Sequence, residues 1–284
     1  MNGLQRVEAG QGWQAQLELR FAQKHSQIGA RTILQRSYHR GPLRVQRPFY
    51  PEDNLAHVYI LHPPAGVVGG DELNIQLELL PGAQVLSTTP GSGKFYLSAG
   101  RIASLEQRLH IRSGASLEWL PQENILFAGA RLHATTTIEV EDDGRFIGWD
   151  LTCLGRVSND ERFDRGSFYS RLLFYHNRRL LLVENQRVLD EESLEAAAGL
   201  RNQPLQATLL AFPCTDEFLE PVRARLSVQG TSSLIAATLV DGLLVVRALG
   251  SNSEALKQQL ISIWQVLRPL LLDRPVVQPR IWAT

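Results

Sequence analysis

The sequence has little of several residue types that usually mark a function class. It holds only two cysteines, Cys153 and Cys214, among 284 residues, and they do not form a C-x-x-C pair. A disulfide framework and a zinc knuckle both need more cysteines at closer spacing, so we expect two reduced thiols. Neither sign of charge is in excess, with 29 Lys plus Arg against 29 Asp plus Glu. A nucleic-acid-binding surface needs a basic excess, so we expect no nucleic-acid partner.

Long hydrophobic runs are also lacking. The N-terminal stretch, residues 1–16, contains no apolar segment of the kind found in signal peptides. The most apolar stretch, residues 256–272, is interrupted by Lys257 and Arg268, and no run reaches the roughly 18 apolar residues that a membrane-spanning helix needs. We therefore expect a cytoplasmic protein without a membrane partner.

No sequence motif indicates a catalytic nucleophile or a nucleotide site. A glycine-rich run at residues 88–95, TTPGSGKF, has the Gly-Lys pair of a phosphate-binding loop. However, Thr88 stands where that loop needs its first glycine, and Phe95 stands where it needs a Ser or Thr for magnesium. A structural turn is the better interpretation, and we expect no GTP hydrolysis by this chain.

The histidines do not form a metal-binding pattern. His57 and His62 are five residues apart, so on one strand they would point to opposite faces. No H-x-H or H-E-x-x-H motif occurs. We expect no tight metal site built from neighbouring residues, while a weak site assembled across the fold stays open.

Alternation of apolar and polar residues dominates the chain and predicts a mainly β protein. Leu73, Ile75, Leu77 and Leu79 alternate with polar residues, as in a strand with one buried face. Gly-containing turns such as Pro81-Gly82 and Ser113-Gly114 separate these segments. The expected strands cover residues 57–61, 73–79, 84–88, 104–111, 116–120, 132–140, 147–153, 168–175, 180–189, 206–212, 234–240 and 243–249.

Helical patterns come late in the chain. The strongest covers residues 254–272, with Leu256, Leu260 and Trp264 at helical spacing and a capping box expected from Ser251 and Glu254. Shorter helices are predicted at residues 193–198 and 215–226, the latter weakened by a proline. Because no repeat or low-complexity linker is visible, we expect one domain over residues 1–284, with stacked β-sheets and a few helices, the strongest near the C-terminus.

Four acidic residues stand out from this pattern. Asp71 and Glu72 follow a glycine-rich turn and open a strand, where a capping Asp is the simpler interpretation. Asp150 and Glu184 interrupt apolar strands from inside, so each side chain either faces water or needs a buried partner. If both are interior, they line a polar passage, and carboxylate oxygens suit weak, exchangeable binding of divalent cations.

Two other functions are compatible with these acids. A β-rich hydrolase or carbohydrate-binding protein would use Asp71, Asp150 or Glu184, because glycosidases need two carboxylates on either side of one bond. An open cleft with facing carboxylates and aromatic platforms would favour that interpretation, and a narrow polar channel would favour ion passage. In a plain interaction module, the same acids would lie on the surface.

An ordered set of segments resembles a known family along nearly the whole chain. They are GPLRVQRPFYPE at 41–52, HPPAGVVGGDEL at 62–73, TTPGSGKFYLS at 88–98, LEWLPQENILFAGA at 117–130, WDLTCLGR at 149–156, LLVEN at 181–185, WQVLRP at 264–269 and VVQPRIWAT at 276–284. Together they are similar to the urease accessory family UreD, called UreH in some bacteria.

The resemblance implies a non-catalytic chaperone subunit with a fold of stacked β-sheets. With UreF and the GTPase UreG it would bind apo-urease and help insert nickel into the urease metallocentre, with UreE as the nickel donor to the system. Family members are proposed to hold an internal route for nickel. The matching acids, Asp71, Glu72, Asp150 and Glu184, are the lining we expect, with no tightly bound cofactor and with nickel in transit.

Overall fold

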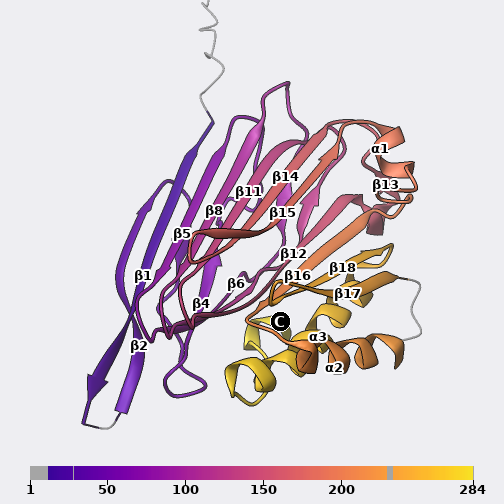
Figure 1. The fold of residues 1–284 in the computed structure, drawn as a ribbon. Coiled ribbons are helices and arrows are strands. Elements are labelled where there is room, and N and C mark those ends of the chain that lie inside the picture. The colour runs from indigo at the N-terminus through magenta and orange to yellow at the C-terminus, as the bar shows by residue number, and fades with distance from the viewer. Residues whose placement is uncertain (1–11, 28, 229–232, 284) are drawn as a thin grey trace, which may run out of the picture.

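The structure is a computed structural model that describes residues 12–27, 29–228 and 233–283, and it consists mainly of two stacked β-sheets (Figure 1). Most of the N-terminal stretch on which no signal peptide was predicted, residues 1–11, lies outside the described residues. The predicted class of stacked β-sheets with few helices is confirmed. Within the described ranges, no helix has both the length and the apolar character needed to span a membrane.

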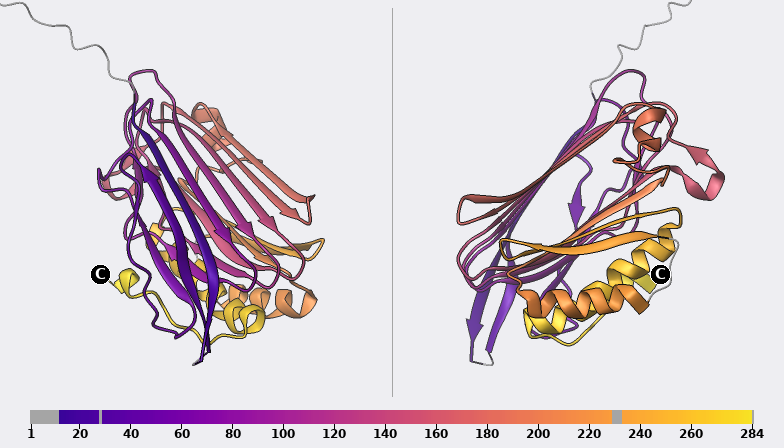
Figure 2. Two further views of the ribbon diagram at one scale, coloured as in Figure 1. Left: turned by 90° about the vertical axis from the view of Figure 1, so that its left-hand side faces the viewer. Right: turned by 45° about the vertical axis from the view of Figure 1, so that its right-hand side comes forward.

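One sheet has seven strands and forms one side of the molecule (Figures 1 and 2). Its five central strands pair in parallel, and an antiparallel pair closes each edge. In spatial order the strands are β15 (Arg179–Val188), β14 (Ser167–His176), β11 (Arg131–Val140), β8 (Ala103–Ile111), β5 (Glu72–Leu79), β1 (Gln14–Ser26) and β2 (Gly29–Arg40).

The other sheet has eleven strands and lies between the first sheet and the helices. Its main path is β17 (Leu234–Val240), β18 (Leu243–Gly250), β16 (Leu205–Phe212), β12 (Arg145–Arg156), β9 (Ser116–Leu120), β6 (Gln84–Thr88), β4 (Ala56–Leu61) and β3 (Arg44–Val45). Three short strands attach beside this path: β7 (Gly93–Phe95), β10 (Asn124–Leu126) and β13 (Glu161–Arg162). The Gly-Lys pair of the failed phosphate-loop motif therefore lies in β7, which pairs in parallel with β10.

Between β4 and β14 the chain alternates between the two sheets and forms coils of a solenoid. Successive coils stack in parallel, so Glu72 pairs with Ser104, His133 pairs with Ser104, and Tyr169 pairs with His133. These partners are separated by roughly 30 residues of sequence. The structure thus corrects the interpretation that the chain has no internal repeat: the repeat is one of backbone path and not of residue identity.

The predicted Gly-containing turns stack on one another at one corner of these coils. Gly82 and Gly114 adopt φ of 73° and 66°, a conformation that favours glycine. The Gly82 N–H donates to the Ser113 carbonyl at 3.2 Å, and the Asp143 carboxylate accepts from the Gly114 N–H at 2.7 Å. Hydrogen bonds between turns therefore help fix the register of neighbouring coils.

The alternation of residues matches the burial of the strands. In β5 the four leucine and isoleucine side chains are buried, and the intervening side chains are not. One apolar cluster fills the space between the sheets, and a second lies between the eleven-stranded sheet and the helices. All twelve predicted strands coincide with observed ones, whereas β1, β2 and four short strands were not predicted. Both cysteines are free, as predicted, and both are buried.

The helices lie together on the outer face of the eleven-stranded sheet, except for the short α1 (Glu191–Glu195) (Figure 1). The structure corrects the predicted capping box of α3 (Ser253–Leu272), because Asn252 and not Ser251 is its N-cap and accepts from the Ala255 N–H at 2.9 Å. Helix α2 (Asp216–Val228) continues through Pro221. That proline is exposed, so water can bond the carbonyl group that lacks a helical partner.

Buried charges attach α3 to the sheet. Arg268 is fully buried, and its guanidinium donates to Glu118 at 2.9 Å and to Glu52 at 2.8 Å. Burial alone would raise the pKa of Glu52, but hydrogen bonds from His57 and Arg268 outweigh burial and lower it, so this carboxylate stays ionised at neutral pH. The network joins β4, β9 and α3, and so fixes the helix layer to the centre of the sheet.

Candidate functional site

Asp150 points into the space between the two sheets. Its neighbour Trp149 lies on the opposite face of β12, within the helix-side cluster, and donates its indole N–H to the Pro121 carbonyl at 2.8 Å. Asp150 therefore faces the other way, where Thr152 donates a hydroxyl to its carboxylate at 3.1 Å. Of the two alternatives that the sequence left open, the structure supports the interior one.

Glu184 approaches the same space from the seven-stranded sheet. It lies in β15, and one carboxylate oxygen, Oε1, accepts from the Thr208 hydroxyl at 3.2 Å and from Arg247 Nε at 2.9 Å. The other oxygen, Oε2, is buried and has no hydrogen-bond partner. A buried carboxylate oxygen without a donor is costly, so this atom is available for a ligand.

A small polar cavity brings Asp150 and Glu184 together. It has a volume of about 40 Å³ and is otherwise lined mainly by hydroxyl and amide side chains, namely Thr136, Ser170, Gln186, Gln206 and Thr208. One water needs roughly 15 Å³ by this measure, so the cavity has room for two or three water-sized particles. Beside it a cleft of about 690 Å³, to which Glu184 also contributes, opens between the edges of the two sheets.

The charges in the cavity favour a cation. Burial raises the pKa of the Asp150 carboxyl, the hydrogen bond from Thr152 opposes this, and the negative charge of Glu184 raises it further. Two carboxylates that share a confined space repel each other, and a cation between them removes that repulsion. In the part of the chain that the structure describes, no three His, Cys, Asp or Glu side chains gather as a metal site. The pair thus offers few protein ligands, which is typical of weak and exchangeable binding.

The raised pKa of Asp150 predicts a gain in stability when its charge is removed. A folded-state pKa above the unfolded value of 3.8 means that ionisation destabilises the folded state as the pH rises past that value. Asp150→Asn removes the charge and keeps the oxygen that accepts from Thr152. We expect this variant to melt at a higher temperature than the parent at pH 7, with the difference vanishing near pH 4. A lower melting temperature at pH 7, measured by circular dichroism, would contradict this account.

Asp71 and Glu72 lie elsewhere. Asp71 is buried, and its two carboxylate oxygens accept from the Trp13 N–H at 2.8 Å and from the Val68 N–H at 2.9 Å. It thus closes the glycine-rich turn, as the simpler interpretation of the sequence predicted. Glu72 is exposed at the first residue of β5. Neither side chain lines the cavity of Asp150 and Glu184, and their part in a nickel route stays a prediction.

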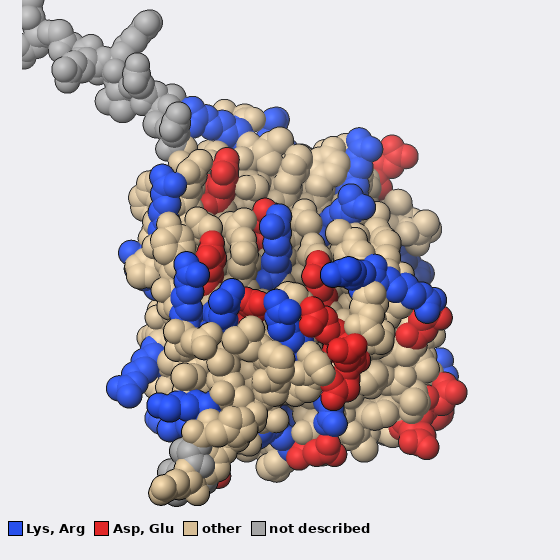
Figure 3. All heavy atoms as spheres, turned by 60° about the vertical axis from the view of Figure 1, so that its left-hand side comes forward, with Lys and Arg blue, Asp and Glu red and all other residues tan. Residues whose placement is uncertain are grey.

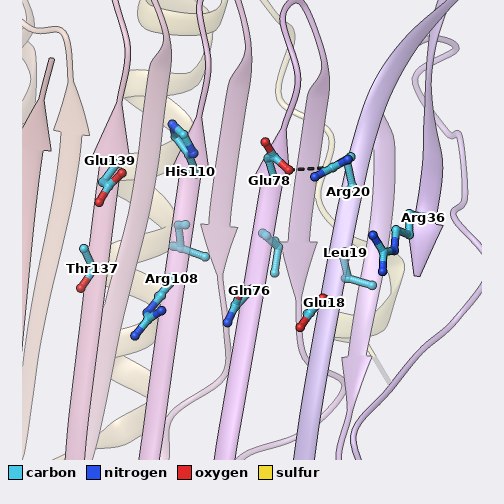
Figure 4. Close-up of a pocket in the computed structure, with 12 residues that line it drawn as sticks. Glu18, Leu19, Arg20, Arg36, Gln76, Glu78, Arg108, His110, Thr137 and Glu139 are labelled. Carbon is cyan, nitrogen blue, oxygen red and sulfur yellow. Dashed lines mark hydrogen bonds and ion pairs between the residues drawn. The ribbon is translucent and has the colours of Figure 1, made fainter. Parts of the chain in front are cut away.

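A second hollow lies on the outer face of the seven-stranded sheet, where side chains of both signs gather in rows (Figure 3). Its volume is about 410 Å³, and Figure 4 shows acidic and basic side chains from neighbouring strands along it. Glu78 accepts from Arg20 and Arg112, each at 2.7 Å, so its carboxylate is already paired. No Phe, Tyr or Trp lines the hollow. It therefore does not combine the facing carboxylates and aromatic platforms that a carbohydrate-cleaving enzyme would need.

Several residues of the cavity were not found from the sequence. Thr136, Gln206 and Thr208 look like ordinary polar positions of alternating strands, because a hydroxyl or amide at such a position has no distinctive spacing. Arg247 has a weak signal, since it interrupts the apolar run Leu243 to Leu249 of β18. An arginine in such a run indicates a nearby acid, but the sequence does not say which one.

Comparison with known proteins agrees with the resemblance found in the sequence. The family model described as UreD urease accessory protein matches residues 14–283. Proteins named urease accessory protein UreD from Alcanivorax borkumensis and Klebsiella aerogenes are 44% and 42% identical, each over 96% of this chain and over 93% and 97% of their own length. The namesake from Escherichia coli is 41% identical over 97% of this chain and 99% of its own. The chain therefore belongs to the UreD family of urease accessory proteins.

Proposed function

We propose that this protein is a non-catalytic chaperone subunit of urease maturation. In the cytoplasm it acts with UreF and the GTPase UreG on apo-urease and helps to insert nickel, which UreE supplies to the system. Family membership supports the role in urease maturation. The observation that carries the part in nickel transfer is the Asp150–Glu184 pair in a polar cavity between the sheets.

The chemistry of this pair suits passage and not storage. Two carboxylates and a few hydroxyl and amide oxygens attract a divalent cation, but they leave most of its coordination to water. An ion held by so few protein ligands leaves easily. The buried, unpartnered Oε2 of Glu184 provides an acceptor that costs no existing hydrogen bond. Nickel would therefore be cargo that moves through the cavity, and no resident metal is required.

Activation of apo-urease tests this proposal. The full chain, co-purified with UreF, UreG and apo-urease, is supplied with nickel and GTP, and urease activity is measured. We expect the double variant Asp150→Ala with Glu184→Ala to lower activation roughly tenfold or more, because loss of groups around a metal ion costs about 10- to 100-fold in affinity or activity. Each single variant should have an intermediate effect.

Glu139→Ala is the matched control, because this acid is exposed on β11, away from the space between the sheets. Its activation should equal that of the parent. Glu72→Ala tests the remainder of the predicted lining in the same assay. If the double variant assembles with all partners and still activates urease at the parental rate, the cavity has no part in nickel transfer.

A further inference from the structure

Arg247 lies at the boundary between the open cleft and the small cavity. In β18 it is in register with Thr208 of β16, and both side chains reach Glu184 of β15 on the other sheet. The cleft is lined by Arg247 and Glu184 but not by Asp150, whereas the cavity is lined by Asp150 and Glu184 but not by Arg247. An ion entering from the cleft toward Asp150 therefore meets the Arg247–Glu184 pair first.

The two carboxylate oxygens of Glu184 differ in their hydrogen bonds. Oε1 accepts from Arg247 Nε at 2.9 Å, and Oε2 is buried without a hydrogen-bond partner. The guanidinium brings the net charge of Asp150, Glu184 and Arg247 to −1, where the carboxylates alone carry −2. With Arg247 in place, a divalent cation thus meets half the negative charge and only one free oxygen of Glu184.

The ion pair is suited to opening. The Arg247 side chain is 51% exposed, and that of Glu184 is 27% exposed. An exposed ion pair contributes little to stability, because water solvates the separated charges well. The guanidinium can therefore turn into the cleft at small cost, unlike the fully buried Arg268, whose partners would be left without compensation.

We propose that Arg247 is a cationic gate that occupies Glu184 until a divalent metal ion displaces it. The inference rests on the proposed passage of nickel and adds its regulation. In the absence of an ion, the guanidinium compensates Glu184 and separates Asp150 from the cleft. When the ion enters, it takes over the carboxylate oxygens, and the guanidinium moves toward solvent. The same competition favours divalent over monovalent cations, because the attraction between an ion and the carboxylates scales with the charge of the ion.

Nickel affinity tests the gate directly. The full chain is titrated with Ni²⁺ alone in a calorimeter, and Arg247→Gln is compared with the parent and with Arg247→Lys. We expect Arg247→Gln to bind Ni²⁺ about two- to fivefold more tightly, the factor that loss of an exposed ion pair allows. Arg247→Lys, which keeps the charge, should bind like the parent. Arg187→Gln is the matched control, because this exposed arginine lines the same cleft but lies beside Tyr169 and not beside Glu184.

A double-mutant cycle separates the gate from the proposed function. In a Glu184→Ala background, Arg247→Gln should no longer change Ni²⁺ affinity, because its partner is gone. Suppose that Arg247→Gln binds Ni²⁺ no more tightly than the parent, while Asp150→Ala and Glu184→Ala still impair urease activation. The proposal that Arg247 is a gate is then wrong, and the proposed passage of nickel through the cavity stands. If neither carboxylate variant changes Ni²⁺ affinity or activation, both proposals fail. A merely structural role of Arg247 would lower the melting temperature without raising the affinity.

Discussion

Arg268→Ala is expected to lower the free energy of unfolding by about 3–5 kcal/mol, the usual cost of removing one partner from a buried ion pair. Arg268 is fully buried, and Glu118 and Glu52 around it are 1% and 6% exposed. Without the guanidinium, both buried carboxylates lose the cation that bonds them. Glu52 keeps its hydrogen bond with His57, and Arg274 acts on both carboxylates only through its charge. Urea unfolding followed by tryptophan fluorescence measures the loss, because Trp264 donates its indole N–H to Glu118 at 2.6 Å and reports on the site.

Two controls separate charge from packing in this experiment. Arg280→Ala removes an arginine that is exposed near the C-terminus, and it should change stability by less than about 0.5 kcal/mol. The triple variant Arg268→Met, Glu118→Gln and Glu52→Gln removes the buried charges together and should recover part of the loss, since no carboxylate remains uncompensated. A loss below about 1 kcal/mol for Arg268→Ala would mean that water reaches the network and that it is not the main attachment of α3.

Phe174→Ala is expected to cost about 3–5 kcal/mol, because it opens a cavity between the two sheets. Phe174 comes from β14 and is fully buried, and its ring centroid lies 5.9 Å from that of Phe146 and 5.5 Å from that of Phe212 in the opposite sheet. Phe146 brings this aromatic cluster next to Asp150, because both residues line one narrow space. Denaturant unfolding gives the change in free energy.

Phe174→Leu is the conservative substitution with which Phe174→Ala is compared. It keeps most of the buried volume, so it should cost less than about 1.5 kcal/mol. Equal losses for the two variants would show that the contact between aromatic rings matters more than the filled volume. We also expect Phe174→Ala to impair urease activation more than its stability loss alone explains, because the new space adjoins Phe146, which lines one narrow space with Asp150.

The strands and helices could be predicted from the sequence where one face of the element is buried and the other is exposed. The alternation from Leu73 to Leu79 reports directly on β5, and the leucine spacing of α3 places that helix to within one residue of its observed start. The missed N-cap has a local cause: Ser251 and Asn252 are both good capping residues, and only the backbone decides between them. Pro221 was given too much weight, because an exposed proline bends a helix without ending it.

The pairing of strands and of site residues could not be read in this way. Parallel partners such as Glu72 and Ser104 are joined by a whole coil, and nothing local in the sequence states which strand lies beside which. Asp150 and Glu184 were identified singly, as acids that break apolar strands. Their meeting depends on the stacking of two sheets. Asp71 was identified differently, by the glycine-rich turn before it, and its carboxylate accepts from backbone N–H groups. Capping and ligand binding therefore look alike in the sequence until the turn is seen.

The attachment of the helix layer has a consequence for how the chain folds. Arg268 bonds to partners that precede it by 150 and 216 residues. These contacts form only after Arg268 has left the ribosome, although the coils from β4 to β14 can stack before then. During synthesis, the apolar face of the eleven-stranded sheet that α3 later covers stays open to water. We therefore expect folding to be slow relative to that of a chain with local contacts, and aggregation through this apolar face to compete with folding until α3 covers it.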